Sequence, residues 1–117
     1  MKIEKQVIEK KLSFAELTIE IEQVGEDFLI LIHGGERPHI GSVVLAIPRP
    51  SLKNDGSASC TSSVLNVTGH KDEKICRLVA EKFCKKFQTV VTCAGGFHVD
   101  NLTEEKIQEV VQACKSF

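Results

Sequence analysis

The chain has 117 residues, of which 42% are hydrophobic and 26% charged, and its formal net charge at pH 7 is −1. This balance is typical of one compact folded domain, so we expect residues 1–117 to form a single domain and exclude a disordered chain or a large multidomain enzyme. Basic residues are not in excess, and Trp and Tyr are absent, which argues against nucleic-acid partners and anionic membranes.

The N-terminal segment 1–6 is charged and does not resemble the apolar core of a signal peptide. The longest apolar runs, 28–32 and 43–47, are far shorter than the roughly 20 residues that cross a bilayer. We therefore expect a cytoplasmic protein.

Five cysteines occur without a C-x-x-C pair, a pattern that favours reduced thiols over a disulfide framework or a zinc site. The periodicity places Cys60, Cys76, Cys93 and Cys114 on strand or helix faces that can be buried, where cysteine behaves as a small hydrophobic residue.

The first half of the chain predicts four strands. Residues 16–22 alternate strictly between apolar and polar side chains, which is the pattern of a strand with one face exposed. A turn at Gly25-Glu26-Asp27 leads into the apolar run 28–33. A third strand over 40–47 is expected to stop at Pro48-Arg49-Pro50, and a fourth covers 59–68. Residues 1–11 are expected to form a flexible arm or an edge strand.

The second half predicts two helices around a short strand. Apolar residues recur at three- and four-residue spacings over 75–87, so we expect an amphipathic helix of about four turns. A fifth strand is expected over 88–93, a flexible loop at Ala94-Gly95-Gly96, and a second helix over 103–116 capped by Asn101 or Thr103.

The order β-β-β-β-α-β-α indicates an α+β domain. We expect a single, mainly antiparallel sheet of about five strands, the first four forming a meander, with two helices packed on one face. The edges of such a sheet favour a homodimer, formed through the sheet or through the first helix.

Candidate functional residues cluster at the ends of the predicted elements. The segment Gly69-His70-Lys71 begins a helix, where free backbone N–H groups and a cation offer a phosphate site. Arg49, between two prolines, is presented from a stiff segment suited to bidentate binding of an anion. The alternatives are an ordinary turn at Gly69 and a solvated arginine. His39, Ser51, His98 and Asp100 lie at other element ends.

The patterns argue against metal and hydrolase chemistry. The four histidines show no H-x-H or H-E-x-x-H spacing. A nucleophilic site built from Ser51 or Cys93 with His98 and Asp100 lacks a G-x-S-x-G elbow, and His98 with Asp100 equally fits a loop that caps the second helix.

Three segments carry a family resemblance: 39–52 (HIGSVVLAIPRPSL), 67–72 (VTGHKD) and 96–103 (GFHVDNLT). In this order and spacing they resemble the small D subunit of gallate- and vanillate-type hydroxyarylic acid decarboxylases, the LpdD-like family. The resemblance covers Gly34 to the C-terminus, and PRPS and GHKD are its most specific parts.

This resemblance implies a non-catalytic chaperone that carries prenylated flavin mononucleotide from a flavin prenyltransferase to a UbiD-type decarboxylase. Arg49 and Gly69-His70-Lys71 would hold the phosphate of the flavin, His39, His98 and Asp100 would line its ring or ribitol, and Ser51 would complete the binding site. A carrier binds and releases, so it needs no nucleophile.

Two other classes remain open. One is a small enzyme that acts on a phosphorylated substrate through His70 or His98. The other is a ligand-free protein-assembly module, a dimer comparable to proteasome-assembly chaperones, in which Arg49 would have no role.

Overall fold

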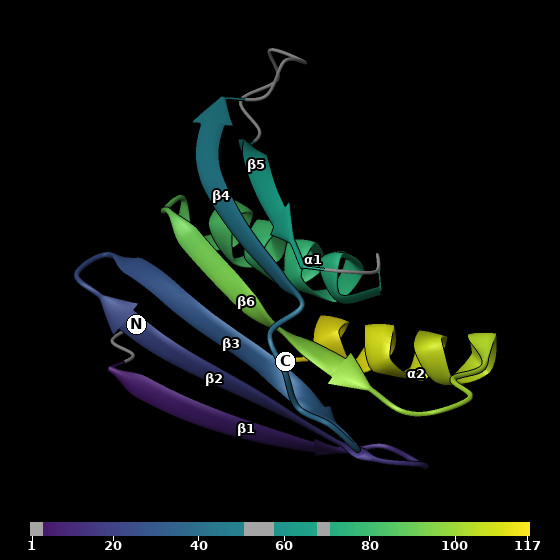
Figure 1. Cartoon of the computed structure of the whole chain (residues 1–117). Coiled ribbons are helices and arrows are strands. Elements are labelled where there is room, and N and C mark those ends of the chain that lie inside the picture. Colours follow the sequence, from purple (N-terminus) through teal and green to yellow (C-terminus); the bar gives the residue numbers. More distant parts are fainter. Residues whose placement is uncertain (1–3, 51–57, 68–70) are drawn as a thin grey trace.

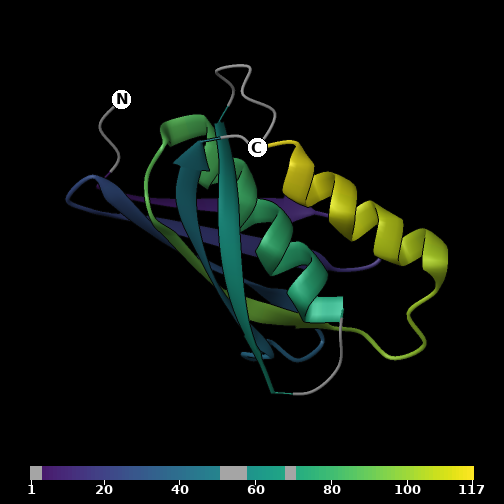
Figure 2. The same cartoon turned by 90° about the horizontal axis from the view of Figure 1, so that it is seen from above.

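The computed structural model describes residues 4–50, 58–67 and 71–117. Its elements in chain order are β1 (Lys5–Lys11), β2 (Glu16–Val24), β3 (Asp27–Gly35), β4 (Ser42–Pro50), β5 (Ala58–Asn66), α1 (Lys71–Phe87), β6 (Val91–His98) and α2 (Glu104–Lys115). Both helices lie on the same face of the sheet (Figure 1, Figure 2). The α+β class and the helices on one face are confirmed.

The sheet has six strands in the order β1-β2-β3-β6-β4-β5, one more than expected. The additional strand is β1, which pairs with β2 at the edge, so most of the first eleven residues form an edge strand. All pairings are antiparallel except that between β3 and β6. The expected four-strand meander is therefore wrong, because β6 lies between β3 and β4 (Figure 1).

Strand β4 continues through Pro48-Arg49-Pro50 instead of stopping at Ile47. Its pairing with β6 covers only Ser42–Ala46, whereas its pairing with β5 reaches Pro50. Beyond Ala46 one side of β4 is therefore an edge, where a missing proline N–H breaks no ladder hydrogen bond.

Strand β6 runs through both glycines that were expected to form a loop. Its parallel register pairs Gly95 with Ile32 and Gly96 with His33. A Cβ atom at Gly95 would collide with the backbone of Ile32, so the glycine permits the close approach of the two strands instead of breaking the ladder.

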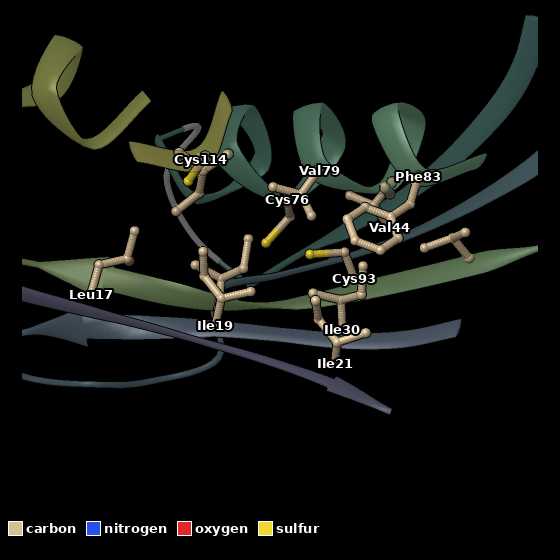
Figure 3. Close-up of a cluster of buried hydrophobic side chains, with 14 of the residues drawn as sticks. Leu17, Ile19, Ile21, Ile30, Val44, Cys76, Val79, Phe83, Cys93 and Cys114 are labelled. Atoms are coloured by element: carbon tan, nitrogen blue, oxygen red, sulfur yellow. The ribbon is translucent and has the colours of Figure 1, made fainter. Parts of the chain in front are cut away.

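The core lies between the sheet and the helices (Figure 3). Alternate residues of β2 and β3, such as Leu17, Ile19 and Ile30, are buried in one cluster with the apolar stripe of α1, which includes Val79 and Phe83. Burial of one such side chain contributes roughly 1.5–3 kcal/mol. Helix α2 begins after Thr103, whose side chain accepts a hydrogen bond from the backbone N–H of Lys106 at 3.3 Å.

The cysteines belong to this core. Cys76, Cys93 and Cys114 are buried as expected, but Cys84 is also buried and Cys60 only half-buried. Burial raises the pKa of the Cys84 thiol to about 11 and that of Cys114 to about 12. These thiols are therefore neutral and poorly nucleophilic at physiological pH.

Within the described residues, neither helix has the length and apolar character needed to span a bilayer.

Candidate functional site

The site is built on the connection between β3 and β4, residues 36–41, which we call the crossover loop. Because β6 lies between these two strands, the crossover loop passes over the C-terminal end of β6. The backbone N–H of Glu36 donates to the carbonyl of His98 at 2.7 Å, and that of Gly41 donates to the carbonyl of Gly95 at 2.9 Å. The topology of the sheet thus brings the crossover loop to His98 and the start of α1.

His39 of the crossover loop pairs with Asp72 in the first turn of α1. The Nε2 atom of His39 lies 3.0 Å from Oδ2 of Asp72, and its Nδ1 atom lies 3.0 Å from the carbonyl oxygen of Arg37. Both neighbours are hydrogen-bond acceptors, so both contacts are hydrogen bonds only when the imidazole is doubly protonated. The His39 ring thus connects the first turn of α1 with the backbone of its own loop.

Asp72 is almost fully buried, with 7% of its surface exposed. Its second oxygen, Oδ1, accepts a hydrogen bond from the backbone N–H of Phe97 at 3.0 Å. Its position in the first turn of α1 also stabilises the negative charge through the helix dipole. Asp72 thus connects α1, the end of β6 and the crossover loop.

Two glycines make room for this pair. A Cβ atom at Gly96 would lie 2.7 Å from Nε2 of His39, and one at Gly41 would collide with Oδ2 of Asp72. The absence of a side chain at both positions lets the imidazole lie against β6 and reach the carboxylate.

A second chain of contacts lies beside the first. The Nε2 atom of His98 is 3.1 Å from Nη2 of Arg37 and 2.9 Å from Oδ1 of Asp100. Because one ring nitrogen either accepts from the guanidinium or donates to the carboxylate, the two contacts are alternatives that depend on the tautomer. Asp100 is fixed through its backbone N–H, which donates to Oε1 of Glu36 at 3.0 Å.

These groups surround a surface hollow of about 490 Å³, lined by Glu36, Arg37, Pro38, His39 and His98. Arg37 forms no ion pair with a carboxylate within the described part of the chain. The exposed guanidinium of Arg37 is the group of this lining that can bind an anion, and the carboxylate of Glu36 lies at the same hollow.

The other hollows fit a ligand less well. A cavity between β6 and the two helices, lined in part by Asp72 and Phe97, measures about 60 Å³. A groove of about 570 Å³ along α1 is lined mainly by charged residues of that helix. Among the described residues, His, Cys, Asp and Glu form no group of three or more that is placed to hold a metal ion.

The structure brings together several of the residues selected from sequence. His39, His98 and Asp100 all lie around the hollow, and Lys71 begins α1, one residue before Asp72. Ser51, Gly69 and His70 lie outside the described residues, and of Lys71 only the backbone is described.

Arg49 is not part of this cluster. It lies seven residues along β4 from Ser42, about 23 Å at the usual rise of a strand. Its Nε atom donates to Oγ1 of Thr61 at 2.9 Å, and its Nη1 atom donates to the carbonyl of Pro50 at 3.1 Å. The structure therefore does not bring Arg49 and the start of α1 together around one phosphate.

The amino-acid sequence alone does not single out Arg37 or the role of Asp72. Arg37 stands in a Gly-Gly-Glu-Arg-Pro segment that indicates only a break between strands. Asp72 is indistinguishable in sequence from an ordinary first-turn acid. Both residues could have been found if β6 had been predicted to lie between β3 and β4. That strand order brings the crossover loop, which carries Arg37, to the start of α1, which carries Asp72.

Comparisons with known proteins give one family and one fold. The sequence profile of the prenylated flavin chaperone LpdD-like domain matches residues 12–117. A chain from the crystal structure of a chaperone complex for yeast 20S proteasome assembly superposes with a TM-score of 0.57 over 97% of this chain and 94% of that chain. Its sequence identity is 8%, so this likeness shows the fold alone. No curated protein matches significantly.

The profile covers nearly the whole chain and includes all three segments that carry the resemblance, the crossover loop and the first turn of α1. The chain therefore belongs to the LpdD-like prenylated flavin chaperone family.

Proposed function

We propose that this protein binds prenylated flavin mononucleotide as cargo and supports a UbiD-type hydroxyarylic acid decarboxylase, without catalysing a reaction itself. A flavin prenyltransferase is the proposed source of the cargo, and the cytoplasm is the proposed compartment. The observation that carries this proposal is the convergence of Arg37, His39 and His98 on one hollow in a chain of this family.

The residues present fit the phosphate end of the flavin. A guanidinium without a carboxylate partner can bind two phosphate oxygens at once. The start of α1 lies at the same end of the sheet, and the first backbone N–H groups of a helix have no partner within that helix, which supports proposed roles for Gly69, His70 and Lys71. The volume of the hollow is within the range of small-molecule sites, about 300–1,000 Å³.

The contacts around the hollow suit binding and release better than covalent chemistry. His39 and His98 each contact a carboxylate, Asp72 and Asp100 respectively. The described lining of the hollow places no serine, threonine or cysteine next to either imidazole. This arrangement fits an accessory protein that binds and releases its cargo, and an assay for turnover of a phosphorylated substrate separates it from an enzyme that acts through His98.

The proposal is tested by anaerobic titration of prenylated flavin mononucleotide, followed by its absorbance. Replacing Arg37 with Ala removes one charge-assisted contact of about 1.5–3 kcal/mol, so binding should weaken roughly 10- to 100-fold. Arg49→Ala is the matched control, because this arginine lies at the opposite end of β4, and it should bind like the wild type. A flavin without the phosphate should bind equally weakly to the wild type and to Arg37→Ala.

Two results would contradict this assignment. The absence of saturable binding by the wild type would remove the carrier function. A loss of binding in Arg49→Ala but not in Arg37→Ala would move the phosphate site to the far end of β4.

A protein-assembly module is the second candidate, favoured by large apolar side chains exposed on the sheet. That function would require no cargo, so the titration separates the two. The expected homodimer is a separate proposal that does not depend on the cargo.

A further inference from the structure

One face of the sheet packs against the helices, and the opposite face, which we call the open face, carries no element in the described residues (Figure 2). Six of its apolar side chains are half-buried or exposed, on β3, β4 and β5: Leu29, Leu31, Val43, Leu45, Ile47 and Leu65. Leu65 is 76% exposed and Ile47 47% exposed. Large side chains at these levels of exposure, gathered on one face, mark an interaction surface.

The strand register makes these side chains one continuous patch. Val43 pairs with Leu65 on one side and with Ala94 on the other, and Ala94 pairs with Leu31. In the next row of the open face, Leu45 and Leu29 flank Thr92 of β6. We call this surface, on β3, β6, β4 and β5, the apolar patch.

Charges lie beside the apolar patch and not within it. Strands β1 and β2 present alternating lysines and glutamates on the open face, with Lys5 paired to Glu22 and Lys11 to Glu16. On the four strands of the patch, the described residues place two charged side chains on the open face, Asp27 at the start of β3 and Arg49 at the end of β4. Both lie outside the rows of Leu29, Leu31, Val43 and Leu45, and Arg49 is hydrogen-bonded to its own strand and to β5. Contact between two such patches therefore brings no like charges together at their centre.

The strand order makes the patch complementary to itself. Its four strands are neighbours in the order β3-β6-β4-β5, so its midline lies between β6 and β4. A twofold axis along this midline places β6 over β4 of the second copy and β3 over its β5. The charged strands β1 and β2 then extend beyond the second copy and remain in water.

The open face of the four strands that carry the patch is large enough for a specific interface. Four strands about 4.8 Å apart and about 25–30 Å long give a footprint of roughly 500 Å² per copy, which includes the apolar patch and the polar side chains beside it on β5. The total of about 1,000 Å² reaches the lower limit of specific interfaces. Two sheets that pack face to face do so through aliphatic side chains of this kind, about 10 Å apart.

We propose that the occupant of the apolar patch is a second copy of this chain, giving a homodimer in which the two sheets pack through β3, β6, β4 and β5. The crossover loop and the hollow lie at the strand ends, so both copies keep an accessible cargo site. The proposal rests on the open face alone and holds whether or not the cargo binds.

The test is the mass in solution, measured by light scattering and analytical ultracentrifugation over a dilution series. The wild type should have twice the 12.9 kDa mass of one chain. Leu45→Lys and Leu65→Lys each place an unpaired charge in the interface, so the dissociation constant should rise about tenfold or more. Both positions face solvent in the single chain, and circular dichroism checks that the variants fold.

Val7→Lys is the matched control, because Val7 is 52% exposed on the open face but lies on β1, outside the patch. It should leave the dimer intact. A monomeric wild type, folded Leu45→Lys and Leu65→Lys variants that both dimerise like the wild type, or equal dissociation of Val7→Lys would each overturn the proposal.

Discussion

At the scale of single residues, the site depends on one buried carboxylate. Asp72 accepts hydrogen bonds from His39 and from the backbone of Phe97, and these contacts join three segments that are distant in sequence. Together these hydrogen bonds stabilise the buried carboxylate. Removing one of the partners is costly, because it leaves another buried polar group without a hydrogen bond.

Replacing Asp72 with Ala should therefore destabilise the fold by about 1–3 kcal/mol, measured by urea denaturation. Asp72→Asn keeps an acceptor for the Phe97 N–H and should lose less. Glu73→Ala is the control in the same helical turn: its ion pair with Arg77, at 2.8 Å, is partly exposed and should contribute under about 1 kcal/mol. Equal stability of the Asp72→Ala and Glu73→Ala variants would show that the buried carboxylate does not hold the segments together.

The sequence predicts only part of this site. His39, His98 and Asp100 stand out because polar residues at the ends of elements are common in binding sites. The partnership of His39 with Asp72 spans 33 residues and depends on the path of the crossover loop, which no local pattern encodes. The location of Arg49, away from the hollow, could not be predicted either, because its flanking prolines indicate the stiffness of the backbone and not its place in the sheet.

At the scale of elements, the spacing of apolar residues predicts whether a segment is a strand or a helix better than it predicts which strands pair with one another. The alternation in β2 and the three- and four-residue spacing in α1 identify a strand and a helix correctly. The insertion of β6 is a non-local pairing. Its run of apolar and small residues from Val91 to Ala94 is typical of a strand with neighbours on both sides, which is where β6 lies.

The turn between β1 and β2 is attached to α2 through Glu109. The backbone N–H and the hydroxyl of Ser13 both donate to this carboxylate, at 2.6 and 2.7 Å, and these bonds lower the pKa of Glu109. A lowered pKa in the folded state means that the carboxylate stabilises the fold above the unfolded pKa of about 4.3. That contribution is lost as the pH falls through the folded pKa.

Glu109→Gln should therefore lower Tm slightly at about pH 7, and the difference from the wild type should shrink as the pH falls below the unfolded pKa of about 4.3. The effect is small because the group is exposed to solvent. Ser13→Ala, which removes one of the two donors and keeps the other, should fall between the wild type and Glu109→Gln. A Tm difference that persists unchanged at low pH would assign the effect to packing instead of charge.

At the scale of the whole molecule, one sheet provides three separate surfaces. One face holds the core against α1 and α2, the strand ends at the crossover loop hold the hollow, and the open face presents the apolar patch. A cargo site at the strand ends and a dimer interface on the open face do not compete for the same residues. In the proposed carrier, loading and release of the cargo would therefore leave the proposed homodimer unchanged.

The most direct measurement of the carrier function is the anaerobic reconstitution of a UbiD-type decarboxylase that lacks its cofactor. The decarboxylase is mixed with prenylated flavin mononucleotide, either free or loaded on this protein, and its activity is followed with time. A carrier predicts faster activation by the loaded wild type than by the free cofactor, no advantage from Arg37→Ala, and no decarboxylation by this protein alone. Equal activation by the free cofactor and by the loaded wild type would contradict the proposed function.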